Sequence, residues 1–289
     1  MLTDNRLVRT FADLKAQDRK ALLPFITAGY PSLDATAAML REFSSRGVRV
    51  CELGIPFSDP VADGPVIQAS YTAALESGVT VGRIFDMVKR FRASEAAGMS
   101  SAAIRNPKSE VRNSLSLLAM VSYSIVFRHG PEQFIRAAAA AGIDGLIVPD
   151  LPLDEADGFS DLAAGVGLCN VLLIAPTTQP QRQLDIARRS RGFIYYMSIA
   201  GVTGQRDSLP DATIAAVREL RRHTDTPICV GFGISNAATV RQVCTVADGA
   251  IVGSAIVSRI TQAAKQNLPP EQIAAQAGQF VGELLAPLA

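Results

Sequence analysis

Short apolar stretches recur along the chain, separated by segments that mix apolar and charged residues. Uninterrupted apolar strands are typical of parallel sheets covered on both faces, whereas alternating ones belong to sheets with one wet face. Helix-like segments, such as Asp34–Arg46 and Pro131–Ala141, lie between the stretches. The pattern predicts strands at Leu22–Thr27, Val48–Leu53, Leu115–Val121, Gly145–Val148, Val171–Ile174, Phe193–Met197, Ile228–Gly231 and Gly249–Val252.

Strands that alternate with helices predict an α/β fold, and eight such units favour a closed (β/α)8 TIM barrel. The alternative is a doubly wound open sheet, which usually has a glycine-rich turn after its first strand. Residues 27–31 have the sequence Thr-Ala-Gly-Tyr-Pro, which is not such a turn. A barrel commonly holds about 250 residues in one unit, so we predict that residues 1–289 form a single domain.

One segment interrupts the regular alternation. Residues 92–113, Arg92–Asn113, contain Gly98, an Asn-Pro pair and scattered charges between the second helix and the third strand. We interpret it as an extended surface-loop insertion. Connections from helix to strand lie on the barrel face opposite the active site, so this insertion is expected to leave the chemistry intact.

The charge balance excludes some functions. Lys and Arg number 28 and Asp and Glu number 27, so no global field draws the chain to nucleic acid or to an anionic membrane. The first residues lack the apolar core of a signal peptide, and no later run is long enough to span a membrane, so a cytoplasmic protein is expected.

Cysteine and histidine offer little chemistry. The four cysteines, at positions 51, 169, 229 and 244, are dispersed without Cys-x-x-Cys pairing, which favours reduced packing residues. His129 and His223 lie in polar turns without a second ligand at metal spacing, so we predict no metal site.

Glu52 stands inside the second apolar stretch and is the first candidate for catalysis. Burial of an ionisable carboxyl without a partner raises its pKa and prepares it to transfer protons near neutral pH. The alternative is a structural ion pair. A proline-rich segment follows, and its stiffness can fix the direction of a second carboxylate, Asp63.

The seventeen residues Glu52–Gln68 resemble the signature of the tryptophan synthase alpha chain family. Further matches follow along nearly the whole barrel at Pro24–Gly29, Val148–Pro152, Ala200–Gly204, Gly231–Ser235 and Gly253–Ile256. The resemblance implies retro-aldol cleavage of indole-3-glycerol phosphate to indole and glyceraldehyde 3-phosphate, a lyase reaction in tryptophan biosynthesis. It implies that Glu52 is the general acid and base, and that Asp63 accepts a hydrogen bond from the indole N–H.

The resemblance also implies substrate contacts. Phe25 and Phe232 would form the walls of the indole pocket, Tyr195 would lie beside the substrate and Glu52, and Thr203 would belong to a loop that closes over the substrate. The two phenylalanines and Tyr195 could equally be core residues, and Tyr196 is adjacent to the latter.

Glycine-rich ends of the last three strands let backbone N–H groups approach an anion, which is the usual phosphate site of a barrel. Each glycine pair alone could be an ordinary turn. The candidates are Gly204, Gly233, Gly253 and Ser254, and the last could cap a short helix.

The family pattern is not complete after the third strand. An asparagine is usual where this chain has Ser124, beside Ile125, and an indole-contacting tyrosine is common at the position of Ser122. We expect a roomier pocket or a differently anchored loop there.

The resemblance further implies a partner, the tryptophan synthase beta chain, in an alpha2beta2 heterotetramer with indole passing through an internal tunnel. Pyridoxal phosphate would belong to that beta chain, and the alpha chain would need no cofactor. The loop Pro56–Pro60 resembles the surface that meets the beta chain. Two alternatives remain: a free-standing lyase that releases indole, and an alpha-like regulatory subunit with weak activity.

Overall fold

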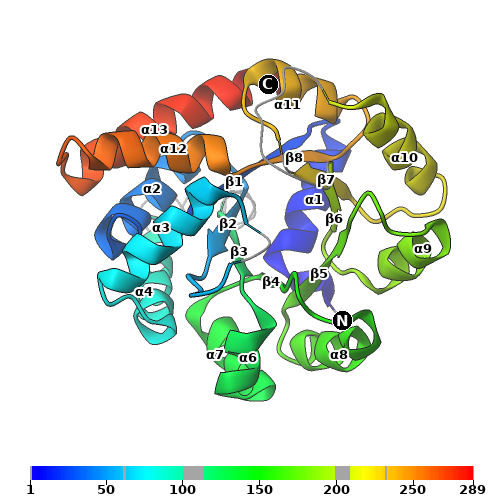
Figure 1. Ribbon diagram of the computed structural model, residues 1–289, viewed down its shortest axis with the longest axis horizontal. Coiled ribbons are helices and arrows are strands. Elements are labelled where there is room, and N and C mark those ends of the chain that lie inside the picture. The colour runs from blue at the N-terminus through cyan, green and yellow to red at the C-terminus, as the bar shows by residue number, and fades with distance from the viewer. Residues whose placement is uncertain (1, 61–62, 100–113, 199–208, 232, 289) are drawn as a thin grey trace.

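The eight strands form one closed parallel barrel in the order β1 to β8, and the helices surround it (Figure 1). The structure is a computed structural model that describes residues 2–60, 63–99, 114–198, 209–231 and 233–288. The closed barrel confirms the predicted (β/α)8 fold and eliminates the open doubly wound sheet.

The strands are β1 (Ala21–Thr27), β2 (Val50–Gly54), β3 (Ser116–Met120), β4 (Gly145–Ile147), β5 (Cys169–Ile174), β6 (Ile194–Met197), β7 (Ile228–Gly231) and β8 (Gly249–Val252). Each predicted stretch coincides with one of them, and the ends differ by two residues or fewer. The match follows from burial, since almost every strand residue is buried.

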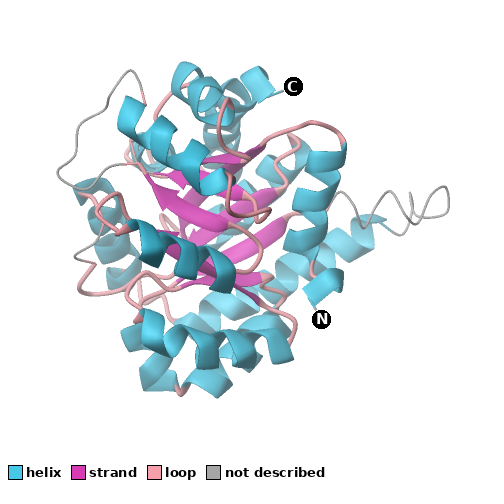
Figure 2. Cartoon of the chain, turned by 90° about the vertical axis from the view of Figure 1, so that its right-hand side faces the viewer, coloured by secondary structure: helices cyan, strands magenta, loops and turns pink. Residues whose placement is uncertain are grey.

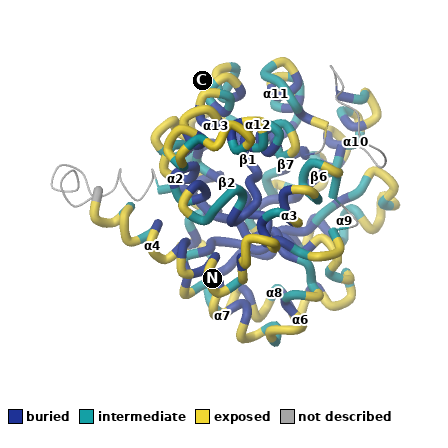
Figure 3. The backbone as a smooth tube through the Cα atoms, turned by 60° about the vertical axis from the view of Figure 1, so that its left-hand side comes forward, coloured by how far each residue is buried: buried dark blue, intermediate teal, exposed yellow. Residues whose placement is uncertain are grey.

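The helices are α1 (Arg6–Ala16), α2 (Leu33–Ser45), α3 (Pro65–Glu76), α4 (Val81–Met99), α6 (Tyr123–His129), α7 (Pro131–Ala141), α8 (Ala156–Gly165), α9 (Pro180–Arg189), α10 (Asp211–Arg221), α11 (Ala237–Cys244), α12 (Ser254–Ala264) and α13 (Pro270–Leu285). Short 3-10 turns lie at Leu2–Asp4, Leu153–Glu155 and Ala286–Leu288. Figure 2 shows helices on all sides of the strands, and Figure 3 shows their buried faces turned inward.

The apolar core has two layers. The outer one lies between strands and helices, and the inner one fills the barrel with side chains of alternate strand positions, Phe25 and Tyr195 among them. All four cysteines are free thiols, and Cys51, Cys169 and Cys229 are buried, as expected for packing residues.

Helix α1 closes the amino-terminal end of the barrel. Its residues Leu7, Phe11 and Leu14 pack with the inner layer, and Figure 1 shows the helix across the barrel opening. Asn5, the N-cap of α1, donates from Nδ2 to the carbonyl oxygens of Asp144 and Gly167, both at 2.7 Å. This closure leaves the opposite end, where the strands terminate, for a functional site.

An ion-pair cluster around Asp144 joins α1 and α4 to the same amino-terminal end. The two carboxylate oxygens of Asp144 accept hydrogen bonds from Arg6 Nη1 at 2.6 Å and from Arg92 Nη2 at 2.8 Å. Arg92 also donates to the carbonyl oxygens of Leu115 and Gly142. Because these bonds join α1, α4 and the segments that precede β3 and β4, the cluster stabilises the closed end of the barrel.

The predicted insertion is partly wrong at its start. We expected an extended loop from Arg92, whereas α4 continues to Met99. The reason is tertiary: the bonds of Arg92 to Asp144, Leu115 and Gly142 hold this part of the segment against the barrel as a helix. Residues 100–113 of the insertion lie outside the described residues.

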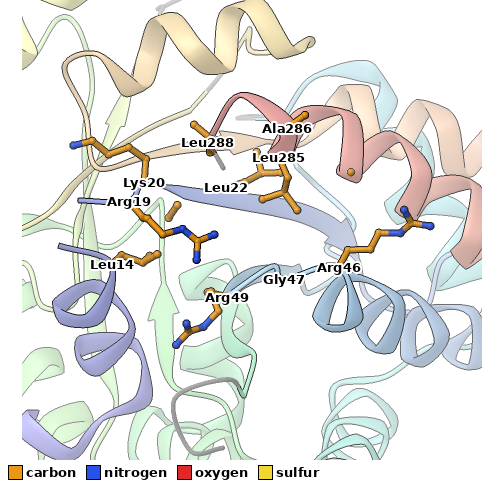
Figure 4. Close-up of a pocket in the computed structure, with 12 residues that line it drawn as sticks. Leu14, Arg19, Lys20, Leu22, Arg46, Gly47, Arg49, Leu285, Ala286 and Leu288 are labelled. Carbon is orange, nitrogen blue, oxygen red and sulfur yellow. The ribbon is translucent and has the colours of Figure 1, made fainter. Parts of the chain in front are cut away.

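A basic pocket of about 310 Å³ lies at the closed end of the barrel, between α1, α2 and α13 (Figure 4). Among its cations, Lys20 pairs with Asp248, Arg46 with Glu42 and Arg49 with Asp13. Arg19, a fourth cation of the pocket, has no ion pair among the described residues, so the pocket keeps a basic character. It is remote from the ends of the strands where the predicted site lies. No helix in the described part of the chain is long and apolar enough to cross a membrane.

Candidate active site

Glu52 is completely buried in the interior of the barrel. It is the third residue of β2, and its relative exposure is 0%. Neither of its carboxylate oxygens has a hydrogen-bond partner, so within the described residues the alternative of a structural ion pair is wrong. Burial raises the pKa of Glu52 well above its ordinary value. Burial thus favours the protonated form of Glu52, which can donate its proton to a substrate.

Asp63 is held at the start of α3 by backbone contacts. Its N–H donates to the carbonyl of Pro60 at 3.1 Å, and the side-chain amide of Gln68 donates to the carbonyl oxygens of Asp63 and Pro60 at 2.8 and 3.2 Å. Gly64 and Pro65 begin the helix directly after it. Burial raises the pKa of Asp63 to about 6. Asp63 is thus a second carboxyl that titrates close to neutral pH.

Tyr195 occupies the barrel interior between β5 and β7. A methyl group added at Gly231 would lie 2.5 Å from its hydroxyl oxygen, so the glycine makes room for the phenol ring. Burial raises the pKa of Tyr195, and the charges of Glu52 and Asp63 raise it further. Tyr195 therefore lies in the electrostatic range of both carboxyls, and Tyr196 points instead into the outer layer.

Phe25 and Tyr71 stand over Gly54, at the carboxyl end of β2. A methyl group at Gly54 would lie 2.6 Å from the Tyr71 hydroxyl oxygen and 2.7 Å from Cε2 of Phe25. Only glycine leaves space for both rings at this position. Since residues two apart on a strand share a face, Gly54 and Glu52 both face the barrel interior. Phe25 consequently forms part of the wall beside the acid, and its contact with the indole stays a prediction.

Neither Tyr71 nor Gln68 is among the site residues predicted from the sequence. Gln68 lies within the family signature, but its role depends on two carbonyl groups of the preceding loop, which no pattern reveals. Tyr71 is seven residues after Gly64, or about two helical turns, so it shares the face of the helix start. That spacing was a usable signal for Tyr71.

The candidate phosphate groups lie at the ends of the last strands. Gly253 is the N-cap of α12 and has no side-chain cap, and Ser254 is the first residue of the helix. The expectation that Ser254 caps a short helix is therefore wrong, because its main chain is already helical and α12 has 11 residues. Gly233, after β7, is exposed and has a φ of +76°. An uncapped helix start with N–H groups facing outward suits an anion.

Three predicted site residues lie outside the described residues. They are Phe232 of the indole pocket, Thr203 of the closing loop and Gly204 of the phosphate group. Their roles remain predictions.

The loop after β3, where the family pattern is incomplete, is anchored by Ser122. Its hydroxyl donates to Oδ2 of Asp150 at 2.7 Å, and the N–H of Tyr123 donates to Oδ1 of Asp150, also at 2.7 Å. The N–H of Ser124 in turn donates to the Ser122 hydroxyl at 3.2 Å. Ser122 thus caps α6 and ties it to the loop after β4.

Comparison with known proteins supports the same assignment. The family model described as tryptophan synthase alpha chain matches residues 11–284. The tryptophan synthase alpha chain of Rhodopirellula baltica is 41% identical over 279 residues, which cover 95% of each chain. That of Prochlorococcus marinus strain MIT 9313 is 43% identical over 275 residues, covering 95% of this chain and 92% of the relative.

Solved structures agree with the sequence relatives. The tryptophan synthase subunit alpha of Legionella pneumophila superimposes with a TM-score of 0.83 at 31% identity, covering 98% of both chains. A chain of tryptophan synthase from M. tuberculosis, in its aminoacrylate-bound form, gives a TM-score of 0.79 at 29% identity and covers 99% of this chain and 100% of that one. The closed barrel, the buried Glu52 carboxyl inside it and these matches together establish that the chain belongs to the tryptophan synthase alpha chain family.

Proposed function

We propose that this chain performs the lyase reaction of its family on indole-3-glycerol phosphate with Glu52 as the proton-transfer group and Asp63 as the electrostatic partner of the indole ring. The observation that carries the proposal is the buried Glu52 carboxyl, which has no hydrogen-bond partner and shares the open end of the barrel with Asp63.

The first step follows from the raised pKa of Glu52. The protonated carboxyl donates its proton to C3 of the indole, and positive charge develops at the ring nitrogen. The Asp63 carboxylate stabilises that charge by accepting a hydrogen bond from the ring N–H. Because its own pKa is about 6, Asp63 is mostly ionised at neutral pH.

The second step returns the proton. Glu52, now a carboxylate, takes the proton of the glycerol hydroxyl next to the ring. The electron pair of that O–H bond forms the aldehyde carbonyl, the bond from indole C3 to the glycerol carbon breaks, and its electron pair neutralises the ring nitrogen. Indole and glyceraldehyde 3-phosphate leave, and Glu52 is again protonated.

The remaining candidates would bind the substrate. The start of α12 at Gly253 and Ser254, together with Gly233 and Gly204, would hold the phosphate through backbone N–H groups. Phe25 and Phe232 would sandwich the indole, Tyr195 would contact it, and Thr203 would close the site. The cleavage uses protein groups alone, so we propose no cofactor in this chain.

We also propose that the chain pairs with a tryptophan synthase beta chain in an alpha2beta2 heterotetramer, with pyridoxal phosphate in the beta chain. Phe127 supports an interface, since 70% of this large apolar side chain is exposed on α6, which follows β3 at the open end of the barrel. The loop Pro56–Pro60 leaves β2 at the same end. The free thiols of all four cysteines support a cytoplasmic location.

The deciding experiment measures indole release from indole-3-glycerol phosphate by the purified chain and by Glu52→Gln, each with and without a beta chain. We expect slow release that the beta chain accelerates and the substitution abolishes. Fast release that the beta chain leaves unchanged would indicate a free-standing lyase. No release under any condition would indicate a regulatory subunit and overturn the proposal.

A second variant separates binding of the beta chain from the cleavage reaction itself. Phe127→Asp places a charge on the exposed patch and is expected to weaken the acceleration by the beta chain while the unaided rate stays the same. Arg128→Asp, on the adjacent exposed position of α6, is a control for the introduced charge. Equal acceleration of Phe127→Asp and the wild type would show that Phe127 is not part of the interface.

A further inference from the structure

Helix α3 covers the barrel, and some of its side chains also pack inside the barrel. Tyr71 is only 3% exposed and packs in the inner layer with Phe25 and Tyr195, whereas most helix residues pack in the outer layer. Val66 and Ile67, from the first turn of the same helix, are partly buried against this inner layer. The start of α3 therefore forms part of the lining at the open end of the barrel.

The hydroxyl group of Tyr71 lies in the layer directly above Glu52. It would be 2.6 Å from a methyl group at Gly54, which follows Glu52 by two positions and shares its face of β2. The charges of Asp63 and then Glu52 act on this phenol, in addition to burial, and raise its pKa. Tyr71 thus brings a hydrogen-bond donor into the electrostatic range of both carboxyls.

The donor is unused in the described part of the chain. No described residue accepts a hydrogen bond from the Tyr71 hydroxyl, and its oxygen is not one of the fully buried unpaired atoms of the described residues, so it remains accessible to a ligand. Its neighbour Ser70 differs, since that hydroxyl contacts Thr27 Oγ1 at 2.6 Å and donates to the carbonyl of Ile67. An unused donor beside two carboxyls suggests a role when the site is occupied.

We propose that Tyr71 is a positioning residue for Asp63, to whose carboxylate its hydroxyl donates a hydrogen bond when the substrate is bound. Asp63 is the better acceptor of the two carboxyls, since its ionised form dominates above pH 6, whereas burial favours the protonated form of Glu52. The hydrogen bond would direct Asp63 toward the indole N–H. The inference rests on the proposed function, because Tyr71 can act on catalysis only if Asp63 binds the indole N–H.

The hydrogen bond has an electrostatic consequence. A donor to a carboxylate favours the charged form, so Tyr71 opposes the effect of burial on Asp63. Among the described residues, the titratable groups on which the charge of Asp63 acts are Tyr195 from β6 and Tyr71 from α3, and the charge of Glu52 from β2 acts on the same two phenols. Of these, the two tyrosines can donate at neutral pH, and Tyr71 is on the same helix that Asp63 precedes.

The test is Tyr71→Phe, which removes one hydroxyl and keeps the ring. We expect kcat for indole release to fall about tenfold, as for one hydrogen bond to a charged group, with KM within twofold. The acidic limb of the rate profile should move to higher pH. Tyr196→Phe is the matched control, because it removes a buried phenol hydroxyl whose pKa is raised by burial alone. Tyr196→Phe should leave kcat and the position of the acidic limb unchanged.

Two further measurements separate this inference from the proposed function. In the Asp63→Asn background, Tyr71→Phe should cause no additional loss if it acts through Asp63. Carbon NMR of the Asp63 carboxyl, with a substrate analogue bound, should show its pKa higher in Tyr71→Phe without any reliance on turnover. Wild-type rate and Asp63 pKa in Tyr71→Phe would overturn the role of Tyr71. Full activity of Asp63→Asn and Glu52→Gln would instead overturn the proposed function.

Discussion

Phe25 and Glu52 are register partners on the neighbouring strands β1 and β2. Side chains paired in this way on parallel strands point to the same face, so the phenylalanine ring stands beside the carboxyl inside the barrel. The ring removes water from the acid and is at the same time a flat apolar wall suited to an indole. One contact between strands therefore prepares both the proton donor and the binding surface.

Glu52→Gln is expected to change the pH dependence of stability. The unfolded carboxyl ionises near pH 4.5, whereas the folded one keeps its proton well above that pH. The wild type should thus lose unfolding free energy as pH rises above 4.5, at about 1.4 kcal/mol per pH unit from this group, until the folded pKa is reached. Urea unfolding of both proteins from pH 5 to pH 8 measures this. If the unfolding free energies of the two proteins changed equally with pH, Glu52 would not be a buried, unpaired acid.

Asp63 should produce an acidic limb in the activity profile. Its pKa is about 6, and only the ionised form can accept the indole N–H. The ratio kcat/KM is expected to fall about tenfold for each pH unit below 6. Asp63→Asn should lower kcat by about 10² to 10³ and remove this limb. An Asp63→Asn profile with the wild-type limb would assign the titration to another group.

Gly54→Ala should disrupt the site by crowding. The added methyl group would lie 2.6 Å from the Tyr71 hydroxyl oxygen, closer than van der Waals contact allows. We expect a loss of about 1 to 3 kcal/mol of stability and a large rise in KM. Gly82→Ala in α4 is the control, since nothing lies within 4 Å of its added methyl group. Thermal unfolding and substrate titration compare the two, and equal behaviour would refute the crowding.

Asp144→Asn should destabilise the protein without changing its chemistry. The side chain of Asp144 is 9% exposed and pairs with Arg6 and Arg92, so its neutralisation leaves Arg6 without a carboxylate and Arg92 with Glu95 alone. We expect a loss of about 3 kcal/mol. Glu132→Gln, from a pair in which both side chains are more than 60% exposed, should cost less than about 0.5 kcal/mol.

The kcat of Asp144→Asn tests whether the ion pairs of Asp144 are independent of the active site. Asp144 precedes β4 at the closed end of the barrel, remote from Glu52, so folded Asp144→Asn is expected to retain the wild-type kcat at 20 °C. A strong reduction of kcat in a fully folded sample would mean that the closed end communicates with the site.

The sequence by itself determined the barrel and the two carboxyls. Strands such as Ile228–Gly231 were predictable to the residue because parallel strands covered on both faces must be apolar throughout. An acid inside such a strand is conspicuous for the same reason, so Glu52 was identified without a structure. The pattern of apolar residues along a segment indicates which of its faces is buried.

Only the tertiary structure decided which partner each buried or polar group meets. It showed that Glu52 has no ion-pair partner and that Tyr71 lies inside the barrel. It also showed that Ser122 binds Asp150, and that Arg92 extends a helix where a loop was expected. These outcomes depend on contacts between residues far apart in the sequence, 28 positions for Ser122 and Asp150 and 52 for Arg92 and Asp144. A single sequence specifies such contacts only through the folded chain as a whole.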